Sequence, residues 1–116
     1  MMTLVSRLRT AAHFDRLRIL GLCAHADLTV CELAKILDLP RKRVERHVRL
    51  LARADLLFCS GQRPRSSYHV NTGRTDGGLV QLLIDLLPHH DGFHKRDLQR
   101  LEAIHDARSK GTACLS

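Results

Sequence analysis

Apolar side chains recur at three- and four-residue intervals along most of the chain, which is the spacing of amphipathic helices. Prolines, glycines and short polar turns interrupt this spacing and separate six segments. The segments predicted as helices are 4–12, 15–24, 30–37, 40–54, 79–87 and 93–109. Two short strand-like pieces, 56–59 and 67–70, flank a loop that contains Gly61 and Pro64. The pattern therefore predicts a mainly α protein with one small β-hairpin.

The third predicted helix has a clear start and a clear end. Thr29 and Glu32 have the spacing of a capping box, in which each side chain accepts the backbone N–H of the other residue. The helix is expected to end at residues 38–40, because Pro40 suits the first turn of the next helix. We therefore expect two consecutive helices joined by a very short turn.

The predicted helix at 40–54 has two chemically different sides. Val44, Val48 and Leu51 form an apolar stripe that we expect to pack against the rest of the fold. The charged residues on and around the other side are Arg41, Lys42, Glu45, Arg46, Arg49 and Arg53. A helix with one anchored side and one positive side is suited to the major groove of DNA.

Charge is concentrated in one part of the chain. Residues 41–65 hold eight Lys and Arg against two acidic residues, so this segment contributes +6 of the overall formal charge of +7. Two of these cations, Arg63 and Arg65, lie at the tip of the predicted hairpin. Such a concentration is typical of a polyanion-binding site. The alternative is an ordinary solvated charged face.

The chain is long enough for one domain, which we expect over residues 1–110, with a flexible tail at 111–116. No apolar run approaches the roughly 18 residues of a membrane span, and the start lacks a secretory signal, so a cytosolic location is expected. The four cysteines form no C-x-x-C pair, which argues against a zinc ribbon and favours four separate thiols. No catalytic motif stands out, so we expect no enzyme and no cofactor.

Several blocks of the sequence resemble the ArsR/SmtB family of bacterial winged-helix repressors. The blocks are Arg16-Leu17-Arg18-Ile19-Leu20, Leu28-Thr29-Val30-Cys31-Glu32-Leu33-Ala34, Val44-Glu45-Arg46-His47-Val48-Arg49-Leu50-Leu51 and Ala54-Asp55-Leu56-Leu57. The resemblance covers roughly residues 4–110. It implies a winged helix-turn-helix, a homodimer formed by the first and last helices, and an effector that changes affinity for operator DNA. The effector classes it implies are a metal ion, arsenite, a sulfur or redox species, or a small molecule.

The resemblance also assigns roles to residues. The helix at 40–54 is expected to read the major groove and the hairpin to touch the flanking backbone or minor groove. The DNA-binding candidates are Arg41, Lys42, Glu45, Arg46, Arg49, Arg63 and Arg65. The chain departs from the family at four places. The recognition helix starts with Pro40-Arg41-Lys42, and Glu45 stands where a small polar residue is usual. Only Tyr68 remains of the wing's usual aromatic pair, and His13 stands where the family has an N-cap Asp for the second helix.

Cys31 is the candidate effector residue, because a thiol at a helix N-terminus has a lowered pKa and reacts more readily. A plain buried cysteine is the alternative. Arsenic-sensing members carry further cysteines where this chain has Thr29 and Ala34, so an arsenic site is incomplete. His94 and His105 have the ten-residue gap of a zinc-sensing motif, but Gly92 and Arg108 stand where its other ligands belong. We therefore expect no metal at these two histidines.

The sequence as a whole predicts a sequence-specific DNA-binding transcriptional regulator, a repressor that binds a palindromic operator as a homodimer and responds to an effector or to thiol redox state. The alternative is a winged-helix module that has lost DNA reading and binds proteins instead. Glu45 motivates this alternative, since a carboxylate repels phosphate.

Overall fold

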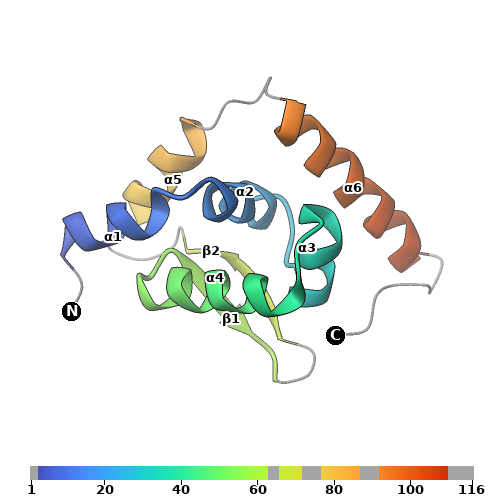
Figure 1. Ribbon diagram of the computed structural model, residues 1–116, viewed down its shortest axis with the longest axis horizontal. Helices are drawn as coiled ribbons and strands as arrows, with labels where there is room; N and C mark the ends of the chain where they lie inside the picture. The colour runs from blue at the N-terminus through green and yellow to red at the C-terminus, as the bar shows by residue number, and fades with distance from the viewer. Residues whose placement is uncertain (1–2, 63–65, 72–76, 87–91, 110–116) are drawn as a thin grey trace.

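The computed structural model describes residues 3–62, 66–71, 77–86 and 92–109. Within these residues, the helices pack together and a small antiparallel hairpin extends from one edge, beside α4 (Figure 1). The helices are α1 (Leu4–Ala11), α2 (Phe14–Cys23), α3 (Val30–Leu37), α4 (Arg41–Arg53), α5 (Gly77–Asp85) and α6 (Gly92–Ser109). The strands are β1 (Leu57–Ser60) and β2 (Ser67–Val70). This order and arrangement confirm the predicted winged helix-turn-helix.

The central helix is α2, which packs against α1, α3, α4, α6 and β2. Its buried residues Ile19, Leu20 and Leu22 sit in the same apolar core as Leu33 of α3 and Leu51 of α4. Burial of such side chains is the main favourable term in folding. The core therefore lies directly behind α3 and α4 and supports both helices from one side.

The capping box at the start of α3 is confirmed. The Thr29 hydroxyl accepts the amide of Glu32 at 3.2 Å, and the Glu32 carboxylate accepts the amide of Thr29 at 3.0 Å. Glu32 is buried, so this pairing satisfies polar groups that water does not reach. At the other end, Asp38 adopts the left-handed conformation with φ 56° and ψ 50°, which stops α3 and redirects the chain into α4.

The hairpin is tied to the helices as well as closed on itself. The two strands pair from Leu57 opposite Val70 to Ser60 opposite Ser67. Leu28, which lies between α2 and α3, bridges to Tyr68 of β2 through two backbone hydrogen bonds of 3.1 and 2.8 Å. The base of the wing is thus connected to the residues that precede α3.

A buried ion pair connects α2 to α6. Arg18 donates from Nη2 and Nε to the two carboxylate oxygens of Asp97, at 2.8 and 3.0 Å, and the two side chains are only 11% and 3% exposed. The hydrogen bond with Asp97 is the main cause of the raised pKa of Arg18. A second carboxylate, Asp15, lies 3.5 Å from the same guanidinium, and the Phe14 ring centroid lies 5.6 Å from its central carbon.

The apolar residues Leu4, Val5 and Leu8 of α1 are exposed, and α1 buries Arg7 and Ala11 instead. Arg7 faces inward because its Nε donates to the carbonyl of Ala54 at 2.8 Å. The spacing identified the apolar side of α1 but could not show whether this chain alone covers it.

α5 begins at Gly77, two residues before the start that the sequence predicted. Val80 is the fully buried residue of this helix, whereas Leu82 and Leu86 are 55% and 70% exposed. Within the described residues, no helix has the length and apolar character that crossing a membrane requires. The tail predicted at 111–116 lies outside the described residues.

Candidate nucleic-acid interface

The buried side of α4 is held by the residues expected from the sequence. Val44, Val48 and Leu51 are at most 1% exposed and belong to the main core. The helix begins without a side-chain cap, and the carbonyl of Pro40 accepts the amides of Arg43 and Val44 at 3.0 and 3.2 Å. Packing rather than capping therefore fixes the orientation of α4.

The opposite side of α4 is open to solvent and strongly positive. Its exposed cations are Arg41, Lys42, Arg43, Arg46, Arg49 and Arg53. This set, called the basic face below, runs the length of the helix. Because its cations are solvated, each is available to a phosphate or to the edge of a guanine base.

Glu45 is the one acidic residue of α4 and lies half-buried beside the basic face. Its Oε1 lies 3.6 Å from Nε of Arg41, four residues earlier in the helix. Both side chains are substantially exposed, at 43% and 52%, so this pair adds little to stability. The contact shows that Glu45 is matched by a cation of the same helix.

His47 lies on the inner side of α4 and is 6% exposed. Arg16 of α2 donates from Nε to Nδ1 of His47 at 3.2 Å and from Nη1 to the carbonyl of Thr10 at 3.0 Å. Burial, followed by the nearby charges of His13 and Arg16, lowers the pKa of His47. The imidazole is therefore neutral near pH 7 and packs between α2 and α4.

The wing lies beside α4, since β1 follows this helix directly and packs against it. The turn from α4 into β1 includes Asp55, which has a φ of 59°, and the side-chain amide of Asn71 donates to the Asp55 carbonyl at 3.0 Å. The wing-tip candidates Arg63 and Arg65 lie outside the described residues. The described part thus positions the base of the wing but not its tip.

The cysteines do not form the set of separate thiols that the sequence suggested. Cys31 is half-buried in the first turn of α3 and is disulfide-bonded, and its partner is neither Cys23 nor Cys59, which are free. Cys23 is buried in the core, and this burial strongly raises the pKa of its thiol. Cys59 is exposed on β1. Sequence separation alone could not indicate which thiol has a partner.

The two zinc-motif candidates, His94 and His105, both belong to α6. His105 is exposed on α6, and the side chain of His94 lies outside the described residues. A different group was missed by the sequence reasoning: His13 and Asp15 at the start of α2 lie near His47 of α4. His47 is more than thirty positions from His13 and Asp15 in sequence, so only the fold brings it close to them.

Comparison with known proteins relates this arrangement to a family. Residues 15–57, which span α2, α3 and α4 and reach β1, match the model described as "Bacterial regulatory protein, arsR family". No curated protein sequence matches significantly.

Two solved structures are similar to this one, both of HlyU from Vibrio cholerae. The first, described as reduced HlyU, is 26% identical in sequence and has a TM-score of 0.59; the matched region covers 71% of this chain and 85% of the HlyU chain. The second is also 26% identical, covers 71% of this chain and 88% of its own, and has a TM-score of 0.60.

Proposed function

We propose that this chain is a repressor that binds a palindromic operator as a homodimer. The proposal builds on the match of residues 15–57 to the arsR family model and on the similarity to HlyU, which support a DNA-binding transcriptional regulator. The observation that carries the proposal is the division of α4. Three buried apolar residues anchor it, and its basic face is exposed along the full length of the helix. In this proposal, Arg46 and Arg49 contact base edges and Arg41 and Lys42 contact the backbone at the N-terminal end.

The exposed apolar residues of α1 and α5 support a homodimer. Leu4, Val5, Leu82 and Leu86 are each more than half exposed, and the two helices lie toward the same end of the molecule in Figure 1. Several large apolar side chains exposed at one end of a molecule are typical of an interaction site. A two-fold dimer presents two copies of α4, which matches a palindromic site with half-sites about one turn of DNA apart.

A charge introduced among the exposed apolar residues of α5 tests the dimer. Leu82→Glu should shift the protein toward monomer in analytical ultracentrifugation while leaving its helical circular dichroism unchanged, because Leu82 is not part of the chain's own core. The matched control is Gln62→Glu, which adds the same charge at an exposed position of the hairpin, away from the terminal helices. A monomer–dimer equilibrium that is the same for both variants would refute this interface.

Substitution on the basic face tests the DNA-binding assignment. Arg46→Ala and Arg49→Ala should each weaken binding to the DNA upstream of the protein's own gene by about 1–3 kcal/mol, or roughly 5- to 150-fold. Lys95→Ala removes the same charge from an exposed site on α6 and should have little effect. Fluorescence anisotropy at several salt concentrations measures both affinity and the salt dependence that phosphate contacts cause.

Glu45 favours the second candidate function, a protein-interaction module, because an acidic residue beside the basic face opposes phosphate. The ion pair with Arg41 weakens that argument, since the carboxylate is already matched by a cation. Absence of any DNA shift at low salt, together with a stable complex with another protein, would favour the module. Equal DNA affinity for the parent and both arginine variants would show that α4 is not the reading helix.

We propose further that the regulator responds to thiol redox state through Cys31. This residue lies in the first turn of α3, and α3 leads into α4 through only three residues, 38–40. Forming or breaking the disulfide at Cys31 changes a covalent constraint on α3, and α4 packs against α3. Operator binding should be measured with reductant, oxidant, arsenite and zinc, in the parent and in Cys31→Ser. If the variant responds to oxidant as the parent does, Cys31 is not the sensor.

A further inference from the structure

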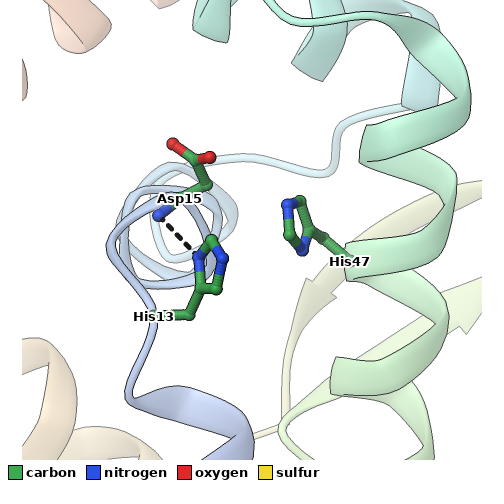
Figure 2. A group of neighbouring side chains, drawn as sticks. All are labelled: His13, Asp15 and His47. Atoms are coloured by element: carbon green, nitrogen blue, oxygen red, sulfur yellow. Dashed lines mark hydrogen bonds between the residues drawn. The ribbon is translucent and has the colours of Figure 1, made fainter.

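Three side chains of the types that bind transition metals converge where α2 begins and α4 passes it (Figure 2). His13 is the N-cap of α2, Asp15 lies in its first turn, and His47 comes from the middle of α4. One ligand atom from each residue lies within 4.8 Å of the other two. The imidazoles of His13 and His47 face each other, with ring centroids 4.8 Å apart.

A second observation concerns Nε2 of His47. This atom is buried and has no hydrogen-bond partner, and His47 as a whole is only 6% exposed. Burying a polar atom without a partner is costly, and such groups call for a physical explanation. The described residues offer this nitrogen no hydrogen-bond partner, while the neighbouring His13 is exposed and Asp15 is partly exposed.

We propose that His13, Asp15 and His47 form a binding site for a first-row divalent metal ion, with Zn²⁺ as the best match. Two imidazole nitrogens and one carboxylate oxygen are a common zinc ligand set, with water as the fourth ligand. The site combines a fixed, buried ligand in His47 with exposed His13 and half-exposed Asp15, so an ion can enter from solvent. The carboxylate also offsets part of the metal's charge, which a site of histidines alone does not.

Binding requires a small closure of the site. Ligand atoms about 2.1 Å from a tetrahedral zinc lie roughly 3.4 Å from one another. In the structure the three ligand atoms lie within 4.8 Å of one another, so they must move closer. The movement falls to His13 and Asp15, which lie at the surface end of α2, because His47 is held by the core. The closure therefore draws the start of α2 toward the middle of α4.

Arg16 competes with the metal for His47. Its Nε–H donates to Nδ1, so the neutral imidazole carries its proton on Nε2. A metal bound at Nε2 requires that proton to move to Nδ1, and the bond from Arg16 is then lost. Since one such hydrogen bond changes an equilibrium by roughly fivefold, Arg16→Gln should tighten metal binding by at least that factor. A side chain that served only to pack the core would not produce this gain.

The metal is expected to restrain α4, which carries the basic face. An effect on operator affinity would follow from this restraint, and that consequence alone rests on the proposed DNA-binding function. The site itself is tested by direct metal binding, so its failure can be distinguished from failure of the DNA-binding proposal.

The experiment is a Co²⁺ titration of the untagged, chelator-treated protein, followed by visible absorption, with Zn²⁺ as competitor. We expect one Co²⁺ per chain, with the visible bands of a tetrahedral or five-coordinate site and no thiolate-to-cobalt charge-transfer band. His47→Gln and His13→Ser should each weaken binding by at least roughly 30-fold, and Asp15→Asn by roughly tenfold. Ser at position 13 keeps a side-chain oxygen for capping α2, so this variant is expected to fold.

His25→Gln is the matched control, because it removes an exposed imidazole from the turn after α2 and should leave Co²⁺ binding unchanged. If His47→Gln does not fold, the exposed His13→Ser variant decides the outcome alone. The proposal is overturned if the parent binds no Co²⁺, if the spectrum shows a thiolate band, or if His13→Ser binds as tightly as the parent.

Discussion

The ion pair between Arg18 and Asp97 joins α2 to α6, and we expect its loss to destabilise the fold substantially. Asp97→Asn keeps the size of the side chain, so no cavity forms, but it removes the charge that faces a guanidinium only 11% exposed. Breaking a buried pair by removing one partner costs about 3–5 kcal/mol, because the remaining charge stays desolvated. The lower end applies here, since Asp15 remains 3.5 Å from Arg18. The predicted loss of unfolding free energy is therefore about 3 kcal/mol.

Urea denaturation followed by circular dichroism measures this loss, at one protein concentration because a dimer's stability depends on it. The control is Asp106→Asn, which removes the same charge from an exposed position of α6 and should change stability by less than about 0.5 kcal/mol. The double variant Arg18→Met with Asp97→Leu should be more stable than Arg18→Met or Asp97→Leu alone, because the two charges of the buried pair are removed together. A loss below about 1 kcal/mol for Asp97→Asn, or losses that simply add in the double variant, would refute the reasoning.

Three further predictions concern the helices and thiols. Thr29→Ala removes the cap of α3 and should lower the unfolding free energy by about 1 kcal/mol in urea denaturation, whereas Thr29→Ser should retain most of it. Leu51→Ala empties a fully buried position of α4 and should cost about 2–5 kcal/mol in the same assay; a smaller loss would mean that the core rearranges to fill the space. In the native protein, iodoacetamide should modify exposed Cys59 rapidly and spare Cys23, because burial raises the pKa of the Cys23 thiol. Mass spectrometry after proteolysis measures the two rates, and faster modification of Cys23 would contradict the prediction.

The helix-turn-helix was predictable because its signals are local. The capping pair at Thr29 and Glu32 marks the start of α3, and the alternation of Val44 and Val48 with arginines separates the two sides of α4. Each signal depends on residues three or four positions apart, which share a helix face whatever the rest of the fold does. The predicted boundaries of these helices accordingly lie within one or two residues of those in the structure.

The features that could not be predicted depend on contacts between distant segments. Arg7 is buried because the Ala54 carbonyl accepts its Nε–H, and nothing near Arg7 in sequence indicates that partner. His13 looked like a departure from the family's N-cap, and it became informative only when the fold placed it opposite His47. The exposure of the apolar residues of α1 and α5 also depends on how these helices pack, which local spacing does not show. Long-range pairing, rather than local pattern, is the missing information in each case.

The bridge between Leu28 and Tyr68 restricts how the wing can move relative to the helix-turn-helix. Two backbone hydrogen bonds attach the wing to the same connection that leads into α3, so the hairpin base cannot tilt without displacing the start of the helix-turn-helix. The hairpin base and the helix-turn-helix therefore keep a fixed relative orientation when they approach a duplex. Insertions at the far end of the hairpin are expected to alter its reach along the flanking backbone while leaving the spacing between its base and α4 unchanged.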